Sequence, residues 1–321
     1  MKVVAILMGG YDGEREISMQ RGNFVFQHID TTVYKPVKAY ILPEGWYVEI
    51  DDEKIEIDRS DFSFLMDGHS KKIELCYNTI HGTPGEDGYL QAYFDLLGVS
   101  YTGCDAYVSA LTFNKSDCNL ILKGHGQLVP NAITLKKENR GKYTYDAFAE
   151  ELGPTFMVKA CRSGSSLGVS KVNEAKDFVG ALDSAFAVDN LAVAESFIKG
   201  TEVSVGAFRD LDGLTNIMEP TEIVTHNDFF DFEAKYKGAS EEITPARIAA
   251  EERALVQQKT KEIYDLLNIS GIARIDFIIR DGLPHFIEVN TTPGLSPQSI
   301  FPQQARHAGL DLSINNRRKK T

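Results

Sequence analysis

The chain has 321 residues, of which 43% are hydrophobic and 25% charged, and its formal net charge is −12. That length and apolar content suffice for two or three subdomains with cores of their own. The acidic balance argues against nucleic-acid binding, because it repels phosphates. No stretch approaches about 18 uninterrupted apolar residues, so we expect no membrane-spanning helix and a cytoplasmic protein.

The first hundred residues show the pattern of an α/β unit. A buried strand is predicted over residues 2–8, and it ends in Gly9-Gly10 before a helix that starts near Glu14 and runs towards Gln27. Short alternating segments between residues 35 and 80 predict a small β-rich region. A strand leading to His81 follows, then helices over residues 88–97 and 104–113.

A turn-rich link at residues 98–103 marks a probable boundary near residue 100. A second subdomain is expected from there to about residue 195, with an apolar strand at residues 191–194 near its end. The last subdomain contains a long polar loop at about 224–245, a helix at about 247–267 and two β-type segments near residues 272–290.

The sharpest pattern is that pair of β-type segments around Asp281-Gly282, which predicts a hairpin. Alternation puts Arg274 and Asp276 on one face of the first strand, and Glu288 and Asn290 on one face of the second. A two-residue connection would pair residue 276 with residue 287 and separate these side chains. We therefore predict a three-residue connection that pairs Asp276 with Glu288.

The four converged side chains would suit a metal site. Two carboxylates and an amide oxygen are hard ligands of the kind that Mg²⁺ prefers, and Arg274 beside them could stabilise negative charge on a transferring group. The alternative is a surface hairpin that carries an Arg–Asp ion pair.

A Gly/Ser-rich segment, residues 163–168, follows the short strand that ends at Lys159. Its small residues would let backbone N–H groups close around a phosphate, with Lys159 as a nearby cation. The alternative is a flexible hairpin tip. Cys161 lies beside this loop, so a reactive thiol is a second alternative to the interpretation of all four cysteines as reduced thiols.

Three further segments carry polar side chains at positions that suit a ligand. His81-Gly-Thr-Pro-Gly85-Glu86-Asp87 follows a strand, at the sheet edge where α/β proteins bind ligands; its two acids could equally serve the next helix N-terminus. Glu195 and Glu202 could accept hydrogen bonds from an adenine amine or ribose. Lys235-Tyr236 lies in the long polar loop, which could close over an active site.

Taken together in this order, these segments resemble the D-alanine:D-alanine ligase family of the ATP-grasp superfamily. The resemblance runs from Val4 to about Leu310 and rests on His-Gly-x-x-Gly-Glu-Asp-Gly, on Arg-x-Asp-Phe…Glu-x-Asn-Thr-x-Pro-Gly and on the opening Gly9-Gly10…Glu14 motif. It implies an α/β fold of the α+β ATP-grasp type. A Rossmann-like domain (1–100) would precede two ATP-grasp subdomains (101–195 and 196–321, with a mobile loop at 224–245) that hold the nucleotide between them.

The resemblance also implies roles for single residues. Residues expected to contact ATP are Lys115, Lys159, Ser166, Glu195, Ile198, Glu202 and Lys235. Residues expected to hold two Mg²⁺ ions, for which Mn²⁺ can substitute, are Asp276, Glu288 and Asn290. Residues expected around the amino acids are Glu14, Ser165 and Tyr236 as a hydrogen-bonded trio, His81 and Ser299 as orienting groups, and Arg274 with the N–H of Gly294 as an oxyanion hole.

The implied reaction is the ADP-forming ligation of two D-alanines through an acyl phosphate, for peptidoglycan precursors, by a homodimer with no nucleic-acid or membrane partner. Rival interpretations are a relative that makes a D-alanyl ester or mixed dipeptide, an ATP-grasp ligase with another carboxylate substrate, and a non-catalytic nucleotide-binding protein. The sequence departs from the family pattern at several positions. Among them, Asp12 follows Tyr11 where small hydroxyl residues are usual, and Arg21 stands where a serine is usual.

Overall fold

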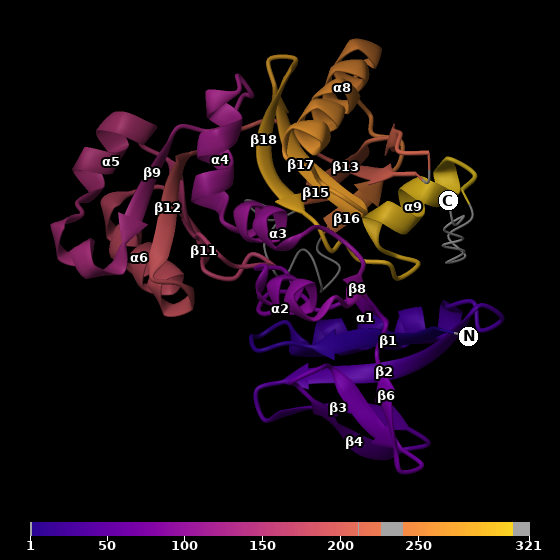
Figure 1. The fold of residues 1–321 in the computed structure, drawn as a ribbon. Coiled ribbons are helices and arrows are strands. Elements are labelled where there is room, and N and C mark those ends of the chain that lie inside the picture. The colour runs from indigo at the N-terminus through magenta and orange to yellow at the C-terminus, as the bar shows by residue number, and fades with distance from the viewer. Residues whose placement is uncertain (1, 211, 226–239, 311–321) are drawn as a thin grey trace.

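The computed structural model describes residues 2–210, 212–225 and 240–310, and its strands form three separate sheets (Figure 1). Within the described part of the chain, no helix is long and apolar enough to cross a membrane. The mixed α/β architecture agrees with the expected fold class.

The N-terminal sheet has the strand order β6-β5-β4-β3-β2-β1-β7-β8. Its strands are β1 (Lys2–Gly9), β2 (Tyr34–Leu42), β3 (Gly45–Ile50), β4 (Glu53–Asp58), β5 (Ser63–Met66), β6 (His69–Lys72), β7 (Leu75–Asn78) and β8 (Ser100–Tyr101). β1 runs parallel to β2 and β7, whereas β2 to β6 form an antiparallel meander. The predicted β-rich region between residues 35 and 80 is therefore confirmed as part of this sheet.

Both faces of β1 are buried, which explains its unbroken apolar sequence. Val4, Ile6 and Met8 pack with Val25 of α1 (Arg15–His28) on one face. Ala5 and Leu7 face a second cluster, which includes Leu90 and Phe94 of α2 (Tyr89–Leu97). Helix α1 thus starts directly after the Gly9-Gly10 turn, at the carboxyl end of β1, and brings Glu14 to that edge of the sheet.

The middle sheet is antiparallel and has the order β11-β10-β12-β9. Its strands are β9 (Ala132–Lys136), β10 (Phe156–Ala160), β11 (Val169–Val172) and β12 (Leu191–Ser196), and its helical segments are η1 (Lys137–Lys142), α5 (Tyr145–Leu152) and α6 (Ala175–Val188). Phe148, Phe156 and Phe178 meet in its core. This core fixes β10 and β12, which carry Lys159 and Glu195.

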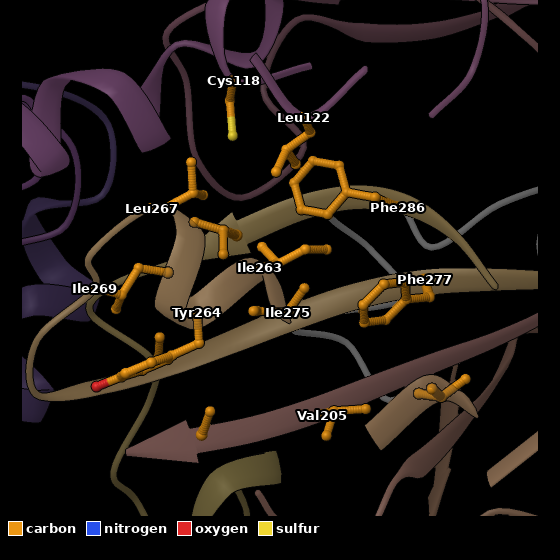
Figure 2. Packing of buried hydrophobic residues seen from close by; sticks show 14 of the residues in the cluster. Cys118, Leu122, Val205, Ile263, Tyr264, Leu267, Ile269, Ile275, Phe277 and Phe286 are labelled. Carbon is orange, nitrogen blue, oxygen red and sulfur yellow. The ribbon is translucent and has the colours of Figure 1, made fainter. Parts of the chain in front are cut away.

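The third sheet has the order β16-β15-β13-β17-β18, with β14 paired to β13. Its strands are β13 (Thr201–Arg209), β14 (Thr215–Ile217), β15 (Thr221–Thr225), β16 (Ser240–Ile243), β17 (Ile272–Arg280) and β18 (Leu283–Asn290), and its helices are α8 (Ala250–Leu266) and α9 (Ile300–His307). The core of this sheet also takes in α3 (Ala106–Phe113) and α4 (Lys115–Gly124), which precede the middle sheet in sequence. Figure 2 shows Cys118 and Leu122 of α4 above Phe286 of β18 and Leu267.

The pairing of Asp276 with Glu288 is confirmed, but the predicted three-residue connection is wrong. Arg280 pairs with Leu283 across a two-residue Asp281-Gly282 turn, in which both residues have positive φ (53° and 76°) as a tight hairpin turn requires. A β-bulge next to Asp276 then takes up one residue of β18, so Phe277 pairs with Phe286 while Asp276 pairs with Glu288. The bulge, not the turn, brings the polar side chains together.

The prediction of a loop over residues 224–245 is wrong at both ends. β15 extends to Thr225 and pairs antiparallel with β16, where Val224 lies opposite Glu241. The backbone N–H and C=O groups of these residues are hydrogen-bonded in the sheet. The polar composition of the segment alone did not indicate this pairing. Lys235 and Tyr236 lie outside the described residues.

Candidate active site

A cleft between the middle sheet and the third sheet brings together residues from distant parts of the chain. Several of its side chains are apolar, including Met157, Ile198, Ile278 and Ile287. Its other lining residues include Lys115, Lys159, Ser166, Glu195, Glu202, Asp276 and Glu288. The cleft therefore gathers all the predicted nucleotide-contacting residues that lie in the described part of the chain, together with two of the three predicted metal ligands.

Lys159 and Glu195 form a buried ion pair in this cleft. The Nζ of Lys159 lies 2.6 Å from Oε2 of Glu195, and Nδ2 of Asn119 in α4 donates to the other carboxylate oxygen at 2.8 Å. Burial alone would lower the pKa of Lys159, but the Glu195 carboxylate raises it above its ordinary value. Lys159 is therefore a fixed cation whose direction is set by Glu195.

The Gly/Ser segment connects β10 to β11 and is bound at both of its ends. The ammonium of Lys115 donates to the backbone oxygen of Ser163 at 2.6 Å, and the hydroxyl of Ser165 donates to Glu14. Ser165 and Ser166 both have positive φ. The segment is the tip of the β10–β11 hairpin, as the alternative expected, and it is held by contacts at Ser163 and Ser165. The Glu14–Ser165 bond joins the N-terminal sheet to the cleft.

The hairpin carries the Arg–Asp ion pair of the alternative interpretation, but this pair is not on the surface. Arg274 holds Asp276 with two hydrogen bonds of 2.9 and 2.7 Å, and their side chains are only 15% and 11% exposed. Arg274 also lies 3.8 Å from Glu288. Although burial would lower the pKa of Arg274, these carboxylates raise it.

The donor set at this point fits a hard divalent cation, since it offers two carboxylates opposite each other and the Asn290 amide opposite Arg274. No group of three or more His, Cys, Asp and Glu side chains suitable for a metal occurs in residues 2–210, 212–225 and 240–310. Any ion would therefore depend on the amide as well as the two acids. Asn290 Oδ1 also accepts a 2.9 Å bond from the N–H of Thr292, so its side chain is held in place.

His81 is deeply buried at the carboxyl edge of the N-terminal sheet. Its ring contacts the guanidinium of Arg21 from α1, and its Nδ1 lies 3.8 Å from Glu86. Burial, together with the charges of Arg21 and Arg274, holds the pKa of His81 well below its usual value. The ring is therefore neutral at physiological pH.

Gly294 and Ser299 lie close to this histidine, in the segment between β18 and α9. A Cβ at Gly294 would lie 2.5 Å from the hydroxyl of Ser299 and 3.0 Å from Nη2 of Arg21. A larger residue at this position would force the Ser299 hydroxyl to move and would crowd the guanidinium of Arg21. The structure thus places the predicted substrate residues His81, Gly294 and Ser299 around Arg21.

Models of two family domains match the chain: "D-ala D-ala ligase N-terminus" over residues 3–104 and "D-ala D-ala ligase C-terminus" over residues 121–314. The chain belongs to the D-alanine–D-alanine ligase family. A D-alanine–D-alanine ligase of Flavobacterium psychrophilum is 48% identical to it over 96% of this chain and 93% of its own length.

Solved structures of ligases agree with this assignment. The chain is similar to the D-alanyl-alanine synthetase A of Vibrio cholerae, with a TM-score of 0.86, 27% identity and coverage of 97% and 95% of the two chains. It is also similar to the VanG D-Ala:D-Ser ligase of Enterococcus faecalis, with a TM-score of 0.85, 30% identity and coverage of 97% and 96%. These similarities extend over all three sheets.

Two acids of this ligase, Glu86 and Asp12, make contacts that the sequence did not predict. Glu86 does not serve a helix N-terminus, because α2 begins only at Tyr89; its carboxylate instead accepts from the N–H of Gly82 at 2.6 Å and from the hydroxyl of Thr292. Asp12 accepts from the N–H groups of Glu14 and Thr83, both at 3.0 Å. Both acids therefore join loops that form the site.

The four cysteines of this ligase are free and buried. Burial raises the pKa of the Cys161 thiol to about 12, so little thiolate exists at neutral pH. The alternative of a reactive Cys161 is therefore not supported, and the interpretation as reduced thiols is confirmed.

Replacing Lys159 by methionine is expected to lower the free energy of unfolding by about 3–5 kcal/mol, because it leaves the buried Glu195 carboxylate without its cation. The double variant Lys159→Met/Glu195→Gln should recover most of this loss. Denaturant unfolding measures both, with Lys136→Met on an exposed position of β9 as control. A loss below about 1 kcal/mol in the single variant would contradict the buried-pair interpretation.

Glu86 gives a prediction about pH. Burial raises its pKa to about 8, and the nearby Glu14 carboxylate adds to the shift. Between about pH 5 and 8, the folded protein thus holds a proton that the unfolded chain has released, so the contribution of Glu86 to stability falls as pH rises. The free energy of unfolding of wild type, minus that of Glu86→Gln, should therefore also fall as pH rises from about 5 to 8. Equal pH dependence in the two proteins would refute this, and Glu74→Gln at an exposed position is the control.

Proposed function

We propose that this chain joins two D-alanines into D-alanyl-D-alanine, with cleavage of ATP to ADP and phosphate, as a step in making peptidoglycan precursors. The observation that carries the proposal is the cleft in which Lys115 and Lys159 face the carboxylates of Asp276 and Glu288. Cations for phosphates and acids for a divalent ion, gathered in one cleft, suit phosphoryl transfer.

The nucleotide would lie between the middle and third sheets. Met157, Ile198 and Ile278 offer apolar surface to the adenine, while Glu195 and Glu202 accept bonds from its amine and from the ribose. The phosphates would then reach Lys115, Lys159 and Ser166, which lie in the same cleft. Lys235 is expected to join them from the segment outside the described residues.

The metal ions would be two Mg²⁺ held by Asp276, Glu288 and Asn290, with Mn²⁺ as a substitute. Bound there, they would neutralise charge on the β- and γ-phosphates. In the structure Arg274 and Lys115 lie near these carboxylates, with Lys115 4.0 Å from Glu288. The site is thus built from charges that balance one another, and phosphate oxygens would complete it.

The amino acids would bind between this hairpin and the N-terminal sheet. Glu14 and Ser165 are hydrogen-bonded to each other, and with Tyr236 they would surround the first D-alanine. His81 and Ser299 would orient the substrates. Arg274 and the N–H of Gly294 would stabilise the oxyanion, because a buried guanidinium and a backbone donor both favour developing negative charge.

The reaction would proceed in two steps. A carboxylate oxygen of the first D-alanine attacks the γ-phosphorus of ATP, and ADP leaves with the electrons of the broken bond. The neutral amine of the second D-alanine then attacks the acyl carbonyl, and the tetrahedral intermediate releases phosphate and loses a proton from nitrogen. The protein acts mainly by positioning and by charge neutralisation.

The expected domain boundaries, residues 1–100, 101–195 and 196–321, stay a proposal, and so do the homodimer and the cytoplasmic location. Because α3 and α4 pack into the core of the third sheet, we expect any movement of the middle sheet to hinge after α4. Such a movement would open and close the cleft above Lys159.

The test is phosphate release from ATP and Mg²⁺ with D-alanine, compared with L-alanine, with D-alanine plus D-serine or D-lactate, and with no amino acid. Mass spectrometry identifies the product. Release that requires D-alanine and gives the D-Ala-D-Ala mass would support the proposal. A preference for a mixed dipeptide or an ester would assign the chain to a related activity, and ATP binding without turnover would indicate a non-catalytic protein.

A further inference from the structure

Arg21 lies among the predicted residues His81, Gly294 and Ser299, at a position that the sequence marked only as a departure from the family pattern. It comes from the side of α1 that faces the site, and its guanidinium contacts His81. Its Nη2 lies 3.0 Å from the position that a Gly294 side chain would occupy, and Ser299 Oγ lies 2.5 Å from the same point. A guanidinium, a neutral imidazole and a serine hydroxyl thus converge.

Arg21 shares the site with two other cations, Lys159 and Arg274, and with the buried acid Glu86, whose pKa is raised by burial and lowered in part by the charge of Arg21. Lys159 is paired with Glu195 at 2.6 Å, and Arg274 holds Asp276 with two bonds. Lys159 lines the cleft proposed for ATP, whereas Arg21 contacts His81 and lies beside the segment that leads to α9. A guanidinium there matches the planar, two-oxygen geometry of a carboxylate.

We propose that Arg21 binds the α-carboxylate of the acceptor amino acid, with Ser299 as a second donor; this inference rests on the ligase activity proposed above. The acceptor carboxylate takes no part in bond formation and can therefore be held by a strong cation. The donor carboxylate must instead reach the γ-phosphate near Asp276 and Glu288, on the side that Arg274 serves. Arg21 is thus a specificity residue for the acceptor.

The test uses D-alaninamide, which has an amine but no carboxylate and so can serve only as acceptor. Equal amounts of D-alanine and D-alaninamide are offered with ATP, and mass spectrometry gives the ratio of D-Ala-D-Ala to D-Ala-D-alaninamide. Arg21→Gln should lower this ratio by about 10- to 100-fold, the loss expected for a bond to a charged partner. The KM for ATP should change less than about twofold, and Arg21→Lys should restore part of the ratio.

Arg15→Gln on the same helix is the matched control, because Arg15 is exposed and pairs with Glu44. An unchanged product ratio in Arg21→Gln would overturn the inference, as would an equal rise in the KM for ATP, which would indicate a structural role. Faster wild-type ligation to D-aspartate than to D-alanine would also overturn it, because Arg21 would then recognise a side-chain carboxylate.

If wild-type protein makes no dipeptide, the proposed ligase function is wrong, and the product ratio cannot be measured. Calorimetric titration with D-alanyl-D-alanine then tests Arg21 alone. Binding by wild type that weakens at least about 10-fold in Arg21→Gln supports a carboxylate site. Equal binding by the two proteins, or no binding by either, contradicts it.

Discussion

Replacing Glu288 by glutamine is expected to lower kcat for D-alanine-dependent ATP cleavage by about 10³-fold or more, because it removes one of the two carboxylates proposed to hold the metal ions. The protein should still fold normally. Glu288 is partly exposed (28%), and Lys115 and Arg274 lie 4.0 and 3.8 Å from its carboxylate, so glutamine can replace it without leaving a fully buried charge.

Steady-state kinetics at several Mg²⁺ concentrations is the measurement, and the variant should need more Mg²⁺ than wild type for half-maximal rate. The control is Asp281→Asn in the turn of the same hairpin. Asp281 is 87% exposed with a φ of 53°, a conformation that asparagine tolerates. A Glu288→Gln enzyme with at least a tenth of wild-type kcat and an unchanged Mg²⁺ requirement would show that the metal lies elsewhere.

Replacing Arg274 by lysine should lower kcat by about 10²- to 10³-fold, the range found when one donor to a developing oxyanion is lost. Lysine keeps the positive charge but cannot reproduce the two parallel bonds to Asp276. The KM for ATP should change little, because the lost interaction is stronger in the transition state than in the bound substrate.

Rapid-quench analysis of the two steps sharpens this second prediction, since the loss should fall on dipeptide formation more than on ATP cleavage. Arg209→Lys on β13 is the matched control, because Arg209 pairs with Asp265 at the exposed end of the same sheet. A kcat within a factor of about three of wild type would remove Arg274 from the proposed oxyanion hole.

The sequence predicted the local elements well, because local patterns specify them. The unbroken apolar run of β1 reflects burial on both faces, and the Asp281-Gly282 dipeptide marked the hairpin. The connection length was wrong because a β-bulge has no sequence pattern of its own. Asp276 still pairs with Glu288, but through a two-residue turn and a bulge instead of a three-residue connection.

Contacts between distant segments were harder to predict. The sequence did not indicate that Asn119 donates to Glu195, that the hydroxyl of Ser204 donates to Asp276, or that Glu86 accepts from Thr292. The first and third contacts join elements that meet only through the packing of different sheets, whereas Ser204 and Asp276 lie opposite each other on the paired strands β13 and β17. Arg21 attracted notice only as a departure from a family pattern, and its contact with His81 depends on how α1 lies against β7 and its following turn.

D-Alanine labelled with ¹⁸O in its carboxylate, incubated with ATP and Mg²⁺, tests whether the reaction passes through an acyl phosphate. An acyl phosphate intermediate requires one carboxylate oxygen to leave with the phosphate. We therefore predict one ¹⁸O in each phosphate, formed together with one D-alanyl-D-alanine, as read by mass spectrometry. Phosphate that carries no label, or phosphate release that does not depend on D-alanine, would contradict the ligase mechanism proposed for this chain.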